Sequence, residues 1–184
     1  MKRQNCEVFG LVKQAEEHPY LTLTEICAML GEHTLPSWQE LPELELYMDQ
    51  VLSLVERYLR GYPGFDERGL TASMINNYVK QGALPPPQKK RYSREHLAKL
   101  LVICLLKTSL PILTIHQLMA GEDIKRFYLC FCELFSDVNR EIAEAYRDSA
   151  GEAATVVQCK AALRAQAEQA LASHLSSAPD EDGK

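Results

Sequence analysis

Three consecutive prolines at residues 85–87 interrupt the chain between two segments with helical patterns. Each proline ring removes a backbone donor and restrains the residue before it, so this stretch cannot be helical. The segment before it, residues 70–82, predicts a compact helix that Thr71 or Ser73 can cap and that a glycine ends. The segment after it begins with Ser93, a favourable helix cap. The chain must therefore leave one helix, cross an extended excursion and enter a second helix at this point.

Helical periodicity dominates the rest of the chain, with apolar residues recurring at steps of three and four. No segment shows sustained alternation of apolar and polar residues, and no Asn-Gly or Asp-Gly pair is flanked by such alternation as in a hairpin. A short helix is predicted after Thr22, and Gly31 can stop it. A second follows the capping box of Ser37 and Glu40; Pro42 can occupy its first position, and its apolar pattern runs from Leu44. The remaining predicted helices are one that starts at Ser93 and is broken by Pro111, a short one that starts at Thr114, the longest over residues 122–147, and an Ala-rich one over 150–175. We expect an all-α fold, a helical bundle with a long C-terminal helix.

The composition is that of an ordinary globular protein, because 46% of the 184 residues are hydrophobic and 24% are charged. The longest apolar run, residues 100–106, is far shorter than the roughly 20 residues that span a bilayer. The first residues also lack the apolar stretch of a signal peptide. We expect a cytoplasmic protein without a membrane partner.

The six cysteines form no pair with metal-binding spacing. Cys130 and Cys132 are closest, but two residues on a helix lie about 200° apart around its axis, so these thiols cannot join one metal. We expect reduced thiols, no metal and no cofactor. The histidines lack zinc-binding spacing, and neither a Gly-rich phosphate loop nor a Gly-x-Ser-x-Gly motif is present. We therefore do not expect an enzyme.

Charge is distributed unevenly along the chain. The formal net charge is −5, yet residues 80–107 carry seven Lys or Arg and a single acid, which makes that window +6 and the remainder −11. The basic residues of the window are Lys80, Lys89, Lys90, Arg91, Arg94, Lys99 and Lys107. Such segregation places a positive field on one face of an acidic protein. This face is either a solvated surface or a surface that contacts phosphates.

The segment from the short helix to Ser93 resembles the winged helix-turn-helix of MerR-type bacterial regulators. Ile75 and Tyr78 match the helix signature of that family. Its Gly-Leu-x-Pro exit is matched by Gly82, Leu84 and Pro85. Tyr92 matches the residue that closes its wing, and Ser93 matches the cap of its next helix. Asn76 and Asn77 stand where that family has Arg and Tyr, and the excursion is shorter than its wing. The resemblance implies a DNA-binding protein that pairs through its long helix.

Four segments also look like the hallmarks of an uncharacterised bacterial family, domain of unknown function 1836. They are Leu35-Pro-x-Trp-x-x-Leu-Pro42, Tyr47-Met-Asp-Gln-Val51, Met74-Ile-Asn-Asn-Tyr-Val-Lys80 and Pro86-Pro-x-Lys-Lys-x-Tyr92. This resemblance covers about residues 35–120. The family label implies no particular chemistry, so the residues themselves must supply the functional hypothesis.

A helix in the DNA major groove presents polar side chains to base edges, and Asn pairs with adenine through two hydrogen bonds. Basic side chains beside the helix contact phosphates. We therefore predict that helix 71–82 reads the major groove and that the basic 88–94 wing contacts phosphates. The candidate DNA-binding residues are Thr71, Ser73, Asn76, Asn77, Lys80, Lys89, Lys90, Arg91 and Arg94. The two asparagines could instead bond to the nearby turn, and Tyr78 and Tyr92 are expected mainly to pack.

The sequence divides into an N-terminal helical arm (1–34), a MerR-like domain (35–121), the long helix with the C-terminal helix (122–175), and a disordered tail (176–184). An apolar stripe with several aromatic residues runs along the long helix. Such a stripe would promote aggregation if a monomer exposed it, so we expect it to form the seam of a homodimer. In the alternative, the C-terminal segment folds back and covers the stripe within one chain.

We therefore expect a sequence-specific protein that binds double-stranded DNA and regulates transcription. The sequence does not name its operator or a small-molecule effector. The alternative is a helical protein-interaction module, in which the helix-turn-helix is a relic that does not bind DNA. In that case Trp38, which lies between two prolines, is a candidate anchor for a protein partner, whereas its other expected role is to hold the N-terminal arm against the domain. Salt-sensitive binding to DNA separates the two hypotheses.

Overall fold

The computed structural model describes residues 21–63, 65 and 69–177, and these residues form helices and connecting loops. β-Structure in the described ranges is limited to two isolated bridges, Leu46 with Tyr92 and Gln88 with Arg91. The helices are α1 (Leu23–Glu32), α2 (Met48–Leu59), α3 (Ala72–Lys80), α4 (Arg94–Leu106), α5 (Ile112–Leu118), α6 (Ile124–Arg147) and α7 (Ala154–Ser177), with a 3₁₀ turn (Asp148–Gly151) between the last two. The predicted all-α fold is confirmed.

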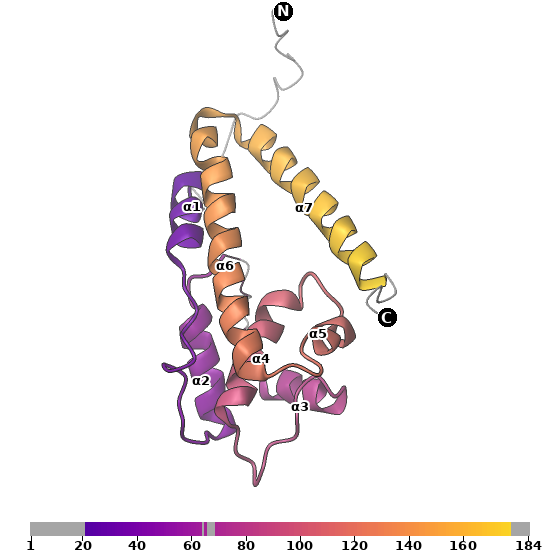
Figure 1. Cartoon of the computed structure of the whole chain (residues 1–184). Coiled ribbons are helices and arrows are strands. Elements are labelled where there is room, and N and C mark those ends of the chain that lie inside the picture. Colours follow the sequence, from indigo (N-terminus) through magenta and orange to yellow (C-terminus); the bar gives the residue numbers. More distant parts are fainter. Residues whose placement is uncertain (1–20, 64, 66–68, 178–184) are drawn as a thin grey trace, which may run out of the picture.

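α6 spans most of the length of the molecule, and the other helices are arranged along it (Figure 1). α1 packs against its C-terminal half, where Gly31 approaches Ala143. α4 packs against α6 at the other end, together with α2, α3 and α5 (Figure 1). α7 diverges from the end of α6 and runs back toward α5, so that α6 and α7 form a V (Figure 1). The candidate DNA-binding helix α3 therefore lies at the opposite end of α6 from α1.

The hydrophobic core is centred on α4. This helix is buried on nearly all sides, which is typical of a helix with apolar residues around its whole circumference. The sequence predicts that five residues of this helix face the core, and they are Leu97, Leu100, Leu101, Cys104 and Leu105. The first four are buried, and Leu105 is partly buried against the core. Tyr128 of α6 joins the core with no exposed surface, and its hydroxyl donates a hydrogen bond to the Pro36 carbonyl at 2.9 Å. α4 thus forms the rigid support behind the candidate DNA-binding surface.

Capping residues stand at several of the predicted helix starts. The hydroxyl oxygens of Thr22 and Thr71 each accept a hydrogen bond, at 3.2 Å, from the backbone N–H of the third residue of their helix. The predicted box of Ser37 and Glu40 is present, since the Ser37 N–H donates to Glu40 Oε2 at 2.7 Å. The residues that follow it form a turn and a loop and not a helix. A capping signal therefore starts a helix only where the following residues are free to continue it.

The second helix starts later than its apolar pattern predicts. α2 begins at Met48, whereas the prediction placed its first residues at Pro42 and Leu44. The N–H and carbonyl groups of Leu46 bond to Tyr92 across an antiparallel bridge, at N···O distances of 2.9 and 2.8 Å. These backbone groups cannot also serve a helix, so the loop before α2 stays extended.

Two shorter helices also have different ends from those predicted. α1 continues through Gly31 and ends at Glu32, so the glycine does not stop it. α5 begins at Ile112, directly after Pro111, and not at Thr114. Pro111 has no N–H of its own to satisfy and its φ of −58° is fixed by its ring, so the helix can begin directly after it.

The ends of the chain are described only in part. Ser176 and Ser177 belong to α7, so the predicted tail of residues 176–184 begins two residues too early. Residues 178–184 lie outside the described residues, as do residues 1–20 of the predicted N-terminal arm. Among the described helices, none is long and apolar enough to cross a membrane.

Candidate nucleic-acid interface

α3 presents its apolar and polar residues on opposite faces. Ile75 and Tyr78 are buried in the core. The exposed polar residues follow the spacing i, i+3, i+4 and i+7 of one helix face, and they are Ser73, Asn76, Asn77 and Lys80. We call these four residues the polar face of α3. Thr71, the fifth candidate of this segment, is also exposed but serves as the helix cap.

The exit from α3 directs the chain toward the prolines. Gly82 has a φ of 76°, a left-handed conformation that glycine adopts without strain. Ala83 and Leu84 are buried, and the Leu84 N–H donates to the Tyr78 carbonyl at 3.2 Å. Burial raises the pKa of Tyr78 to about 12, so its phenol stays neutral and belongs to the packing.

Residues 88–91 form a tight hairpin, which we call the basic turn. The Gln88 N–H donates to the Arg91 carbonyl at 3.1 Å, and the Arg91 N–H donates to the Gln88 carbonyl at 2.8 Å. Between them, Lys89 and Lys90 have φ values of 49° and 65°. Positive φ at both central residues is the signature of a type I′ turn, which favours Asn-Gly. The sequence predicts a basic excursion but not this hairpin, because Lys-Lys lacks the usual signal.

The basic turn is anchored to the loop that precedes α2. Tyr92, directly after the turn, is buried and pairs with Leu46. The Arg91 guanidinium lies over the Tyr47 ring, 5.2 Å from its centroid, and its Nη2 donates to the Tyr47 hydroxyl at 3.3 Å. Tyr47 was not a predicted site residue, because only the Leu46–Tyr92 pairing brings it beside Arg91.

Arg94, the first residue of α4, is engaged by the same loop. Its guanidinium lies over the Trp38 ring at 5.6 Å, and its Nη2 lies 3.3 Å from Glu43 Oε1. The side chain of Arg94 is only 17% exposed, whereas that of Glu43 is 86% exposed. Sequence reasoning missed Glu43, because no local pattern relates it to a residue fifty positions away. Arg94 therefore stands at the edge of the surface and is less accessible than the other candidates.

The start of α4 is fixed by a histidine. His96 Nδ1 accepts a hydrogen bond from the Ser93 N–H at 3.1 Å and lies 2.8 Å from the Ser93 hydroxyl oxygen. Burial lowers the pKa of His96, although the carbonyl groups of Pro85 and Pro86 act in the opposite direction. The lowered pKa favours a neutral imidazole, whose Nδ1 fixes the start of α4 at Ser93.

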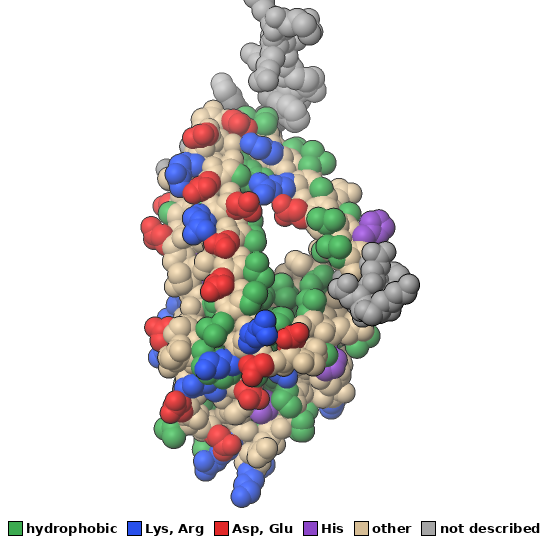
Figure 2. Space-filling view, viewed as in Figure 1, with side chains coloured by type: hydrophobic (Ala, Val, Ile, Leu, Met, Phe, Trp, Pro, Cys, Tyr) green, Lys and Arg blue, Asp and Glu red, His purple; other side chains and the backbone are tan. Residues whose placement is uncertain are grey.

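The candidate residues form a surface that is positively charged at the basic turn and has both basic and acidic side chains beside Arg94. Lys80, Lys89, Lys90 and Arg91 are exposed and form no ion pair with another described residue. Figure 2 shows basic side chains projecting at the end of the molecule where the basic turn lies, with acidic side chains close beside them. The structure therefore brings the polar face of α3 and the basic turn to one end of the fold.

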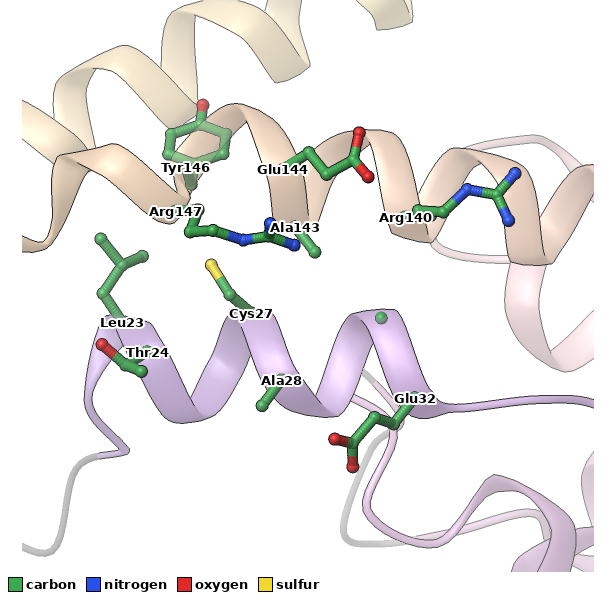
Figure 3. A pocket seen from close by; sticks show the side chains of 11 residues that line it. Leu23, Thr24, Cys27, Ala28, Glu32, Arg140, Ala143, Glu144, Tyr146 and Arg147 are labelled. Atoms are coloured by element: carbon green, nitrogen blue, oxygen red, sulfur yellow. The ribbon is translucent and has the colours of Figure 1, made fainter.

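Two clefts lie along α1, at the other end of the molecule. One, of about 540 Å³, runs between α1 and α6 (Figure 3) and is lined by Cys27 and Ala28 on one side and by Arg140, Glu144 and Arg147 on the other. The second, of about 510 Å³, lies at the junction with α7 and is mainly apolar. Neither is lined by a candidate DNA-binding residue. No group of His, Cys, Asp and Glu in the described part of the chain could hold a metal ion.

Part of the chain matches the model of a known family. A family model described as "Domain of unknown function (DUF1836)" matches residues 36–128, which include α2 to α5, the basic turn and the first residues of α6. No curated protein and no solved structure matches the chain. The matched segment contains every candidate DNA-binding residue as well as Trp38, Glu43 and Tyr47.

Proposed function

We propose that this chain, which belongs to the family described as a domain of unknown function (DUF1836), is a sequence-specific DNA-binding protein that regulates transcription. In this proposal α3 reads the major groove of double-stranded DNA through its polar face. The basic turn contacts phosphates, as the wing of a MerR-like winged helix-turn-helix. A regulator of this kind is expected in the cytoplasm.

The observation that carries the proposal is the backbone conformation of Lys89 and Lys90. A left-handed conformation costs an L-residue roughly 1–2 kcal/mol, and Asn-Gly would relieve that cost in the same hairpin. Strain of this kind is concentrated at functional sites, where the need for particular side chains outweighs backbone preference. Two strained lysines at an exposed tip are explained if their ammonium groups contact phosphates.

The polar face of α3 supports base recognition. Asn76 and Asn77 are exposed, and neither side chain makes a hydrogen bond to another described residue. The alternative role, in which they bond to the nearby turn, has no contact behind it among these residues. Two free amides on an exposed helix face are suited to bidentate pairing with adenine.

A homodimer is part of the proposal. The apolar stripe of α6 is partly covered within the chain by α1 and α4, but Leu134 and Val138 remain 57% and 49% exposed. α7 diverges from the end of α6 (Figure 1). A second copy would bury these residues and bring two copies of α3 to two half-sites of an operator.

The alternative function is a protein-interaction module. It is favoured by the contacts of Arg91 with Tyr47 and of Arg94 with Trp38 and Glu43, because arginines with partners inside the chain have less need of phosphate. The exposed lysines of the basic turn have no such partners among the described residues, so this alternative does not explain them.

Selection of binding sites from random DNA duplexes tests the proposal. We expect a consensus for the wild type, and we expect Asn76→Ala with Asn77→Ala to lose about 1–3 kcal/mol of discrimination at each base pair they read. Gln117→Ala, which removes an exposed amide from α5, serves as the matched control and keeps the consensus. The absence of any consensus for the wild type would reject sequence-specific binding.

A further inference from the structure

The loop of residues 38–47 forms one margin of the candidate interface. It runs antiparallel to the end of the basic turn, because Leu46 pairs with Tyr92. This register sets Tyr47 beside Arg91 and Glu43 beside the first turn of α4. The loop therefore brings the Glu43 carboxylate to Arg94, beside the basic turn.

Arg94 occupies an electrically unfavourable place. The N-terminus of a helix carries partial positive charge, so a cation in the first turn is repelled by the helix that bears it. The face of the Trp38 ring and the Glu43 carboxylate compensate for this repulsion. The same helix end, together with Arg94 and the neighbouring basic turn, favours an anion.

Glu43 is the anion that lies beside Arg94 in this structure. Its carboxylate lies 3.3 Å from the Arg94 guanidinium, while most of its own side chain is exposed to solvent. A carboxylate with this exposure is easily displaced, because a solvent-exposed ion pair contributes little free energy. A DNA phosphate is also an anion, and it accepts hydrogen bonds from arginine.

We propose that Glu43 holds the place that a DNA phosphate takes at Arg94, so that this carboxylate competes with DNA and limits the affinity of the interface. The inference rests on the proposed function and deepens it. The contact with Glu43 lowers binding to every duplex alike, because phosphates carry no sequence information. Discrimination between sequences then depends more strongly on the polar face of α3.

The test replaces the carboxylate with a neutral amide of the same shape. Glu43→Gln is expected to tighten binding to unrelated duplexes about three- to fivefold at low salt. It is also expected to steepen the dependence of log K on log salt by about 0.9, the value for one additional phosphate contact. The matched control is Glu45→Gln, which removes the same charge from an exposed residue of the same loop that has no ion pair with a described residue.

The double variant Glu43→Gln with Arg94→Gln tests the route of the effect. The gain in affinity is expected to disappear when Arg94 is absent, as a coupled pair requires. Circular dichroism and thermal unfolding check that each variant is folded.

The outcomes separate this inference from the proposed function. Equal affinities and equal salt slopes for Glu43→Gln and Glu45→Gln would overturn the inference while the wild type still binds DNA. Weaker binding by Glu43→Gln would also overturn it, because Glu43 would then orient Arg94 for the phosphate. A wild type that binds no duplex at low salt would reject the proposed function, and the inference with it.

Discussion

Lys89 and Lys90 combine a backbone conformation that suits asparagine and glycine with side chains that suit phosphate. Both residues have positive φ, and both are exposed. Nothing in the packing of the turn requires a lysine, because its hydrogen bonds join only the backbones of Gln88 and Arg91. In the proposed function, the two residues therefore give up backbone stability for phosphate binding at a single site.

Exchanging the pair for Asn-Gly tests this opposition. We expect Lys89→Asn with Lys90→Gly to raise the free energy of unfolding by about 1 kcal/mol, because the strain is relieved. The same variant is expected to bind DNA more weakly, with a salt slope about 1.8 lower for two lost phosphate contacts. Urea unfolding and fluorescence anisotropy measure the two effects.

A control for this exchange removes two charges elsewhere. Arg140→Gln with Arg147→Gln changes exposed residues on the C-terminal half of α6, far from the turn. This variant keeps the wild-type salt slope in our account. A stabilised Asn-Gly variant that binds DNA as the wild type does would mean that the two lysines make no phosphate contact.

At the scale of elements, the helices that the sequence predicts well are those whose apolar pattern is long and agrees with their burial. α4 and α6 belong to this group, as do α3 with its Thr71 cap and Gly82 exit. The start of α2 was missed because Leu46 pairs with Tyr92, a contact that no local pattern contains. The polar face of α3 could also be predicted, because the apolar pattern that identifies the helix also shows which of its residues face away from the core.

The surroundings of the candidate arginines could not be predicted. Tyr47 and Glu43 reach Arg91 and Arg94 across more than forty residues of sequence, through that same pairing. The hairpin at the basic turn also escaped prediction, since its central residues are not those that a type I′ turn favours. Both failures arise where tertiary contact or function overrides local preference.

The cap of α4 makes the stability of this element depend on pH. Burial lowers the pKa of His96, so the unfolded chain takes up a proton that the folded chain resists. The stability from neutral His96 is therefore complete above the unfolded pKa of about 6.5 and is lost as the pH falls through the lower folded value. We expect the free energy of unfolding to decrease between pH 7 and pH 5.

His96→Gln isolates this contribution. Glutamine at the third helical position still accepts a hydrogen bond from the Ser93 N–H but does not titrate. The decrease with falling pH is expected to become smaller and not to vanish, because burial also lowers the pKa of His33. Urea unfolding at a series of pH values is the measurement, and identical profiles for wild type and variant would contradict this account.

At the scale of the whole molecule, the fold separates the proposed DNA surface from the proposed dimer surface. α3 and the basic turn lie at one end of α6, whereas the exposed residues Leu134 and Val138 lie along its middle. The sequence predicts the apolar stripe of α6. It does not predict which residues of the stripe pack inside the chain and which stay exposed. That division depends on α1, which covers the C-terminal half, and on α7, which diverges.

Sedimentation equilibrium tests the second surface. We expect the wild type at micromolar concentration to have twice the chain mass of 20.8 kDa, and Leu134→Glu with Val138→Glu to be a folded monomer. Both residues are already largely exposed, so the change should leave the core intact. Leu113→Glu, at an exposed position on α5, is the control and remains dimeric. A wild type of monomer mass would contradict the proposed dimer.

The central claim is that this end of the molecule binds duplex DNA through the basic turn. The most direct measurement is the affinity for one duplex between 50 and 200 mM salt, for the wild type and for the variant with Lys89, Lys90 and Arg91 all changed to Ala. We expect log K to fall linearly with log salt for both, with a slope about 2.7 smaller in the variant, at about 0.9 for each lost phosphate contact. Binding of equal strength and equal slope in the two proteins, or no binding by the wild type at 50 mM salt, would contradict the claim.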